Sequence, residues 1–136
     1  MSDYNSQYSG ARIEELLAMI PNLAKADLSN AMTVSLGANG YAKFNNGLLI
    51  QWGTRVGATW GAINLYFPTS FYNTDYNIYF TGAVNNTGES FIYAPGYDLN
   101  GKYTSYCRVL TRGINSTPAI VWTSWNFTWF AIGRWK

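Results

Sequence analysis

The spacing of hydrophobic residues along this chain of 136 residues changes near residue 40. In the segment SGARIEELLAMIP, residues 9–21, isoleucines and leucines recur at i, i+3, i+4 and i+7, which gives an α-helix one apolar stripe. The serine can cap such a helix and the proline ends it. The pattern predicts a helix over about residues 9–20, followed by a connector to residue 39. A helix this short is marginal by itself in water, so its stripe should pack on a parallel copy in another subunit or on the chain's own domain.

Beyond residue 40, hydrophobic residues come in short runs or alternate with polar ones, as they do in β-strands. The dipeptide Asn46-Gly47 favours a hairpin turn, and we expect loops over 85–89, 94–102 and 112–118. About seven or eight short strands joined by turns are typical of an all-β protein, an antiparallel β-sandwich. The runs after the hairpin turn predict strands over 48–52, 59–67, 76–83, 90–94, 103–111, 119–125 and 127–135.

The last predicted strand carries bulky residues on both of its faces. Phe127 and Trp129 share one side, whereas Phe130 and Ile132 share the other. A strand with one face in water would alternate apolar with polar residues. We therefore expect a second layer or a neighbouring subunit to cover the other face.

Aromatic residues are abundant and unevenly distributed. They make up 18% of the chain, and 22 of the 24 Phe, Tyr and Trp residues lie from Tyr41 onward. This is more aromatic surface than one core needs. Because amphipathic rings are favoured at interfaces and ligand sites, the surplus predicts subunit contacts or a binding surface.

The charge pattern argues against nucleic acid as a partner. Residues 41–136 hold seven Lys and Arg against three Asp and Glu, but the basic residues are scattered singly along the chain. A surface that follows a phosphate backbone needs them clustered. No apolar run approaches the ~20 residues that span a bilayer, so membrane insertion is not expected either. Cys107 is the single cysteine and should pack as a small buried hydrophobe.

The residue types give little support for catalysis. The chain has no histidine, the commonest general base and metal ligand. Asp75, Glu89 and Asp98 are the acidic residues after residue 40, and their spacing does not imply the carboxylate pair of a glycosidase. No nucleotide-binding motif is present. We expect no enzymatic activity, no metal and no cofactor.

The predicted loops instead carry the residue types that recognise sugars. Aromatic rings can cover the C–H face of a sugar, and amide, carboxylate or guanidinium groups can bind its hydroxyls. The alternative is that these residues only form turns and cover the core. Since binding residues concentrate on loops of a rigid scaffold, the candidate receptor-binding or glycan-binding residues are Asn85, Asn86, Glu89, Tyr97, Asp98, Asn100, Lys102, Arg112 and Asn115.

Two motifs bracket the predicted strands and carry a family resemblance. GYAKFNNGLLIQWG spans residues 40–53, WFAIGRW spans residues 129–135, and Phe67-Pro68 lies between them. Together they resemble the C-terminal receptor-binding domain of bacteriophage tail-fibre proteins. The resemblance implies a homotrimer of β-sandwiches that binds a host surface polysaccharide or protein. The residues that it implies to be scaffold are Gly40, Tyr41, Gly47, Gln51, Trp52, Gly53, Trp129, Ala131, Ile132 and Gly133.

The resemblance also implies a division of the chain. Residues 1–39 would attach the protein to other virion proteins of the tail or capsid, and residues 40–136 would be the receptor-binding domain. The chain would be made in the host cytoplasm, carried on the virion and act at the host cell surface. The alternative is a structural virion protein, such as a capsid decoration, head fibre or tail adaptor, whose aromatic residues serve subunit packing only.

Overall fold

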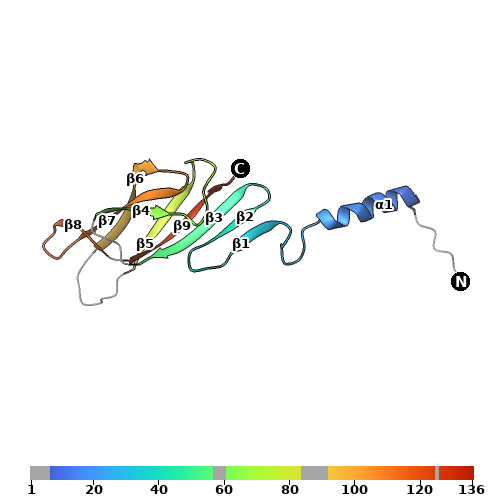
Figure 1. Cartoon of the computed structure of the whole chain (residues 1–136). Coiled ribbons are helices and arrows are strands. Elements are labelled where there is room, and N and C mark those ends of the chain that lie inside the picture. Colours follow the sequence, from blue (N-terminus) through green and yellow to red (C-terminus); the bar gives the residue numbers. More distant parts are fainter. Residues whose placement is uncertain (1–6, 57–60, 84–91, 125) are drawn as a thin grey trace. The chain divides into compact units, whose positions relative to one another are not determined.

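The computed structural model describes residues 7–56, 61–83, 92–124 and 126–136 (Figure 1). The chain divides into two compact units, Met1–Met32 and Thr33–Lys136.

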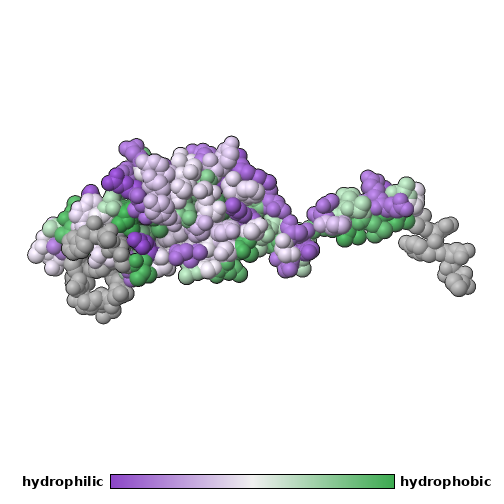
Figure 2. Space-filling model, in the orientation of Figure 1, coloured by the Kyte–Doolittle hydropathy of each residue, from purple (hydrophilic) through white to green (hydrophobic). Residues whose placement is uncertain are grey.

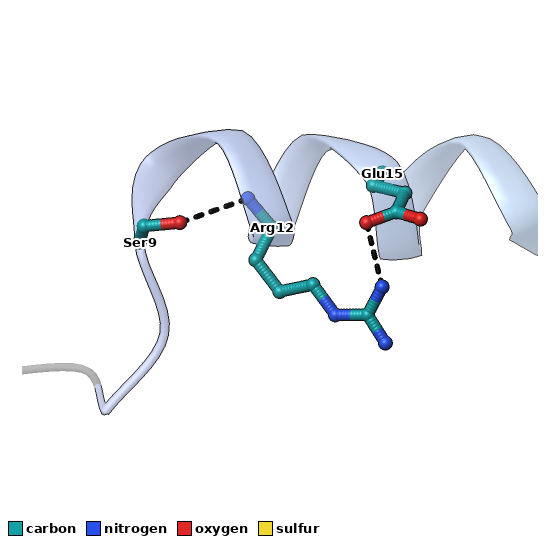
Figure 3. Close-up of polar contacts among 3 residues, drawn as sticks. All are labelled: Ser9, Arg12 and Glu15. Carbon is teal, nitrogen blue, oxygen red and sulfur yellow. Dashed lines mark hydrogen bonds and ion pairs between the residues drawn. The ribbon is translucent and has the colours of Figure 1, made fainter.

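The N-terminal unit contains the predicted helix. Helix α1 spans Gly10–Met19 and continues into a 3-10 turn, η1, over Ile20–Asn22. The backbone N–H of Arg12 donates to Oγ of Ser9, which caps the helix, and the Arg12 guanidinium pairs with Glu15 at 2.6 Å (Figure 3). No residue of α1 is buried, and hydrophobic residues gather along one side of the helix (Figure 2). The apolar stripe therefore has no cover within the described residues.

The first sheet of the larger unit has five strands in the order β1-β2-β3-β9-β5 (Figure 1). Strand β1 begins the sheet inside the segment predicted to be a connector. The β2–β3, β3–β9 and β9–β5 pairs are antiparallel. The strands are β1 (Met32–Ser35), β2 (Gly40–Phe44), β3 (Leu48–Arg55), β9 (Asn126–Arg134) and β5 (Asn77–Ala83).

The second sheet has four strands, with β7 at its centre. Strand β7 (Tyr106–Ile114) pairs on one side with β6 (Ile92–Lys102). It also pairs with β4 (Ala62–Tyr66) over its first half and with β8 (Ile120–Trp122) over its last three residues. All of these pairs are antiparallel.

Two of the predicted loops are wrong in this sheet. Residues 94–102 belong to β6, and residues 112–114 belong to β7. The turn-forming Pro95 and Gly96 caused the first error. A proline is tolerated here because β6 is an edge strand, and the strand bends at an irregularity between Tyr97 and Lys102.

The two sheets enclose one aromatic core, which confirms the predicted β-sandwich. The described residues form nine strands, where seven or eight were predicted. Cys107 is fully buried in this core, as predicted, and burial raises the pKa of its thiol. The core residues are Leu49, Ile63, Leu65, Phe67, Phe71, Tyr76, Ile78, Cys107, Val109, Phe127, Trp129 and Ala131.

The bracketing motifs hold the five-stranded sheet together. Gly47 has a φ of +102°, which the hairpin between β2 and β3 requires, and its N–H donates to Phe44 O. A Cβ on Gly40 would lie 2.6 Å from the ring of Trp52. The buried amide of Gln51 accepts from Thr69 N at 3.0 Å, which ties β3 to the Phe67-Pro68 segment.

The two motif tryptophans occupy different environments. Trp129 lies in the core at 4% exposure, whereas Trp52 is only partly buried and lies outside the core cluster. The indole N–H of Trp52 donates to Gly37 O at 3.2 Å. Trp52 therefore covers β2 on the outer side of the sheet and is not a core residue.

Candidate functional site

The structure places the predicted binding residues in three separate environments. Tyr97, Asp98, Asn100 and Lys102 lie in β6, Arg112 lies in β7, and Asn115 follows β7. The location in loops is therefore wrong for the first five of these six residues. Asn85, Asn86 and Glu89 lie outside the described residues.

Several of these side chains have structural contacts. Lys102 Nζ donates to Tyr76 O and lies 4.5 Å from the centroid of the Tyr76 ring. Asp98 Oδ1 accepts from Asn100 N at 3.0 Å within the irregular part of β6. Asn115 Oδ1 accepts from the backbone N–H groups of Thr117 and Ala119. These contacts stabilise the local backbone and engage the groups that were predicted to reach a ligand.

A cluster of three tyrosines, absent from the predicted set, lies on the outer face of the four-stranded sheet. Tyr66 and Tyr106 are opposite each other in β4 and β7, with ring centroids 5.3 Å apart and tilted by 41°. Tyr103 stacks on Tyr106 at 4.4 Å. Tyr66 is 67% exposed and Tyr103 is 46% exposed. We refer to Tyr66, Tyr103 and Tyr106 as the tyrosine cluster.

Polar side chains continue this surface along the same two strands. Asn64 and Arg108 are also directly opposite each other, two residues from Tyr66 and Tyr106, so all four side chains share one face. Asn64 and Arg108 are both exposed. A depression of about 400 Å³ is lined by Ala62, Asn64, Tyr103, Tyr106 and Arg108.

A second depression lies beside the first and includes the same asparagine. Its volume is about 460 Å³, and β3 contributes Thr54 and Arg55 to its lining. The remaining lining residues are Asn39, Asn64, Leu65, Tyr66, Phe67 and Pro68. Asn64 and Tyr66 thus stand on the strand that the two depressions share.

The surface around the tyrosine cluster is cationic and uncharged polar in character. None of the described residues that line the two depressions is acidic, and each depression contains one arginine. The pKa of Tyr106 is raised mainly by its desolvation and, to a lesser extent, by the neighbouring Tyr103. Its phenol is therefore protonated at neutral pH and can donate and accept hydrogen bonds. The surface offers rings, amides and guanidinium groups to a ligand.

Strand alternation could have revealed this surface from the sequence. In AINLY, residues 62–66, the buried Ile63 and Leu65 leave Asn64 and Tyr66 facing outward. The same alternation in β7 leaves Tyr106 and Arg108 outward while Cys107 and Val109 are buried. The prediction placed binding residues in loops alone and therefore omitted these strand residues.

The outer face of the five-stranded sheet is different because it is apolar. Tyr79, Phe130 and Trp52 form one row across β5, β9 and β3. Ile132 and Ile50 form part of the next row. Tyr79 and Phe130 are exposed. This face carries the second set of bulky residues that the pattern of the closing strand predicted.

Within the described ranges, no group of three or more His, Cys, Asp or Glu is arranged to hold a metal ion. Neither helix described in the chain has the length and apolar character needed to span a bilayer.

Comparison with known families gives one match. The family described as "Putative tail fiber protein gp53-like, C-terminal" matches residues 43–134. No curated protein matches the chain.

Solved structures with a similar fold are pyocin tail fibres. The N-truncated R2-type fibre is 18% identical with a TM-score of 0.57, over 98% of this chain and 54% of that chain. The N-truncated R1-type fibre is 15% identical with a TM-score of 0.56, over 95% and 99%. A C-terminal fragment of the P. aeruginosa R2 pyocin fibre is 18% identical with a TM-score of 0.56, over 98% and 38%. This chain thus spans about half of the first of these structures, and identities this low establish a shared fold only.

Proposed function

This chain belongs to the family of gp53-like tail-fibre C-terminal domains, and we propose that it is the receptor-binding part of a bacteriophage virion fibre. It would attach the virion to a glycan or protein on the surface of the host bacterium. The pyocin fibre fold supports this proposal.

The observation that carries the proposal is the tyrosine cluster with its neighbouring Asn64 and Arg108. The scaffold motifs lie in or beside the five-stranded sheet. Formation of that sheet does not require these residues on the four-stranded sheet. Tyr66 is 67% exposed, so most of its surface contributes nothing to the packing of a monomer. Tyrosine and arginine are the residue types that dominate binding surfaces.

We further propose that the protein is a homotrimer that assembles through the outer face of its five-stranded sheet. The apolar rows around Phe130 and Ile132 form a surface of the kind that marks protein–protein contacts. Covering this face with neighbouring subunits would leave the four-stranded sheet directed outward. The exposed stripe of α1 would bind other virion proteins or the equivalent helices of the trimer.

The proposed role is binding without catalysis. In the described part of the chain, Asp75 accepts from Asn73 and Asp98 accepts from Asn100, so each is held by a residue two positions away. Glu89 lies outside the described residues. Incubation with bacterial polysaccharide should release no reducing ends, and their release would revive an enzymatic function.

The second candidate is a structural virion protein, which the uncovered apolar stripe of α1 favours. Binding of the purified, fluorescently labelled full chain to a panel of bacterial strains separates the two functions. A receptor-binding protein should bind at least one strain saturably, and unlabelled protein or extracted surface polysaccharide or protein from that strain should compete. A structural protein should bind none of them.

A further inference from the structure

Two of the five arginines lie beside β4 without a partner for their charge. Arg12 pairs with Glu15, Arg112 stacks on Trp122 at 4.5 Å, and Arg134 stacks on Tyr72 at 4.8 Å. Arg55 and Arg108 instead line the two depressions that share Asn64. Within the described residues, neither guanidinium has a hydrogen bond or an ion pair.

Given the proposed receptor function, on which this step rests, we infer that the two depressions form one groove for an anionic polysaccharide. Sugar rings stack on the tyrosine cluster, and carboxylate or phosphate groups on the same chain bind Arg55 and Arg108. We refer to the two depressions together as the β4 groove.

The state of Arg55 is the first argument for an anionic ligand. Its Nε atom is buried and has no hydrogen-bond partner among the described residues. A buried donor without an acceptor is costly, and a guanidinium presents its donors in a fork that matches carboxylate and phosphate oxygens. Arg55 also lines the depression, so an anionic group bound there would pair with its guanidinium charge.

The balance of charge on the sandwich is the second argument. From residue 41 onward the chain has seven basic and three acidic residues. No acidic side chain lies among the described residues that line the β4 groove. A bound anion would therefore meet two cations and, among the described lining residues, no carboxylate, and its attraction would weaken as salt is added.

The tyrosine cluster favours a saccharide over an acidic peptide. An apolar anchor of a peptide needs an enclosed pocket, whereas the rings of Tyr66 and Tyr103 lie open at the surface. Flat rings with hydroxyl edges suit a ligand that has C–H faces and many hydroxyl groups. Asn64 and Tyr66 of β4 lie between the depression that contains Arg55 and the depression that contains Arg108. A ligand that reaches both arginines must therefore be an oligosaccharide long enough to cross β4.

The test is calorimetric titration of the full chain with four defined polymers. These are alginate oligosaccharides, which carry carboxylates, a ribitol-phosphate oligomer, which carries phosphates, neutral dextran oligosaccharides, and poly-L-glutamate. We expect saturable binding to the alginate or to the ribitol-phosphate oligomer, and this result identifies which anion the groove accepts. A monomeric uronic acid should not compete at the concentration at which the oligomer saturates.

Arg55→Gln and Arg108→Gln should each weaken the binding by about tenfold or more, because each removes a charge-assisted contact. Arg134→Gln is the matched control, since it removes an exposed arginine that lies outside the groove. Arg108→Lys keeps the charge and should retain part of the affinity. Thermal unfolding of each variant should match that of the wild type.

Three results would overturn the inference. These are no saturable binding to either anionic saccharide, equal binding of dextran or poly-L-glutamate, and an equal affinity of Arg108→Gln and Arg134→Gln. If the wild type binds a bacterial strain and the Arg55→Gln/Arg108→Gln double variant binds it with equal affinity, the β4 groove is not the binding site, but the receptor function stands. If the wild type binds no strain, the receptor function itself fails.

Discussion

Trp52 and Trp129 belong to the two bracketing motifs and yet have different roles. The ring centroid of Trp129 lies 5.7 Å from that of Phe67 inside the core. Trp52 lies on the opposite side of the sheet, against Gly40. A motif therefore marks residues that shape the sheet, and burial decides how much stability each contributes.

Replacing Trp129 by Ala should lower the free energy of unfolding by about 3–5 kcal/mol, because it leaves a large cavity in the core. Trp52→Ala is the matched variant and should cost less, since part of its ring is already in solvent. Urea denaturation measures both. An equal loss of unfolding free energy in the two variants would contradict a buried Trp129 and a partly exposed Trp52.

Alkaline pH should destabilise the protein through Tyr76. Burial raises the pKa of this phenol far above its ordinary value, and its hydroxyl donates to Tyr103 O at 3.1 Å. The folded state therefore favours the protonated form. Its contribution to stability is complete below about pH 10, where an unfolded tyrosine titrates, and is lost as the pH rises further.

Unfolding followed by circular dichroism between pH 8 and pH 12 tests this expectation. The free energy of unfolding should fall above about pH 10, and Tyr76→Phe should show a smaller fall although it loses one hydrogen bond. A Tyr76→Phe variant with the same pH dependence as the wild type would exclude Tyr76 as the cause.

Among the elements, those with a strong local pattern were predictable. The helix follows from its apolar spacing, a serine cap and a proline stop, and the hairpin follows from Asn46-Gly47. Strand β9 follows from its alternation. Strand β1 and most of β6 were not predictable, because β1 is short and largely exposed and Pro95-Gly96 resembles a turn.

The candidate site was predictable only in its chemistry. Aromatic, amide and guanidinium groups were expected at a binding surface, but they were assigned to loops. The tyrosine cluster depends on the pairing of β4 with β7, which joins residues about 40 positions apart. Strand register across such a distance is not encoded in any local pattern.

A buried threonine in the middle of β7 ties this strand to both of its neighbours on one edge, β4 and β8. Thr111 Oγ1 lies 2.8 Å from Gly61 O, just before β4, and 2.9 Å from Thr123 O, just after β8. Its single proton is shared between these carbonyl groups. Thr111 therefore fixes the ends of two short strands.

Thr111→Val preserves the volume but removes the hydroxyl, so it should lower the free energy of unfolding by about 1–3 kcal/mol. Thr81→Val, in the exposed part of β5, is the control and should change stability by about 0.5 kcal/mol or less. Chemical denaturation compares the two. A cost for Thr111→Val no greater than for Thr81→Val would mean that its hydrogen bonds contribute little.

The whole molecule has two outer sheet faces of opposite character. The five-stranded sheet presents apolar rows, and the four-stranded sheet presents rings and cationic groups. We propose that the first face serves assembly and that the second face binds the receptor.

Light scattering at micromolar concentration should give a mass near three times the 15.2 kDa of one chain. Phe130→Arg should shift the mass toward the monomer, because it places a charge in the apolar rows, while the circular dichroism spectrum of the sandwich is retained. A wild-type monomer at this concentration would contradict the proposed trimer.

Receptor binding by the four-stranded sheet is tested by the dissociation constant of the full chain on a bacterial strain that it binds, compared between Tyr66→Ala and Tyr72→Ala. The two tyrosines are matched in exposure, at 67% and 62%, but only Tyr66 belongs to the tyrosine cluster. We predict that Tyr66→Ala weakens binding by about tenfold, for a loss of roughly 1.4 kcal/mol, whereas Tyr72→Ala binds as the wild type does. Equal affinities of the two variants would contradict receptor binding by the four-stranded sheet.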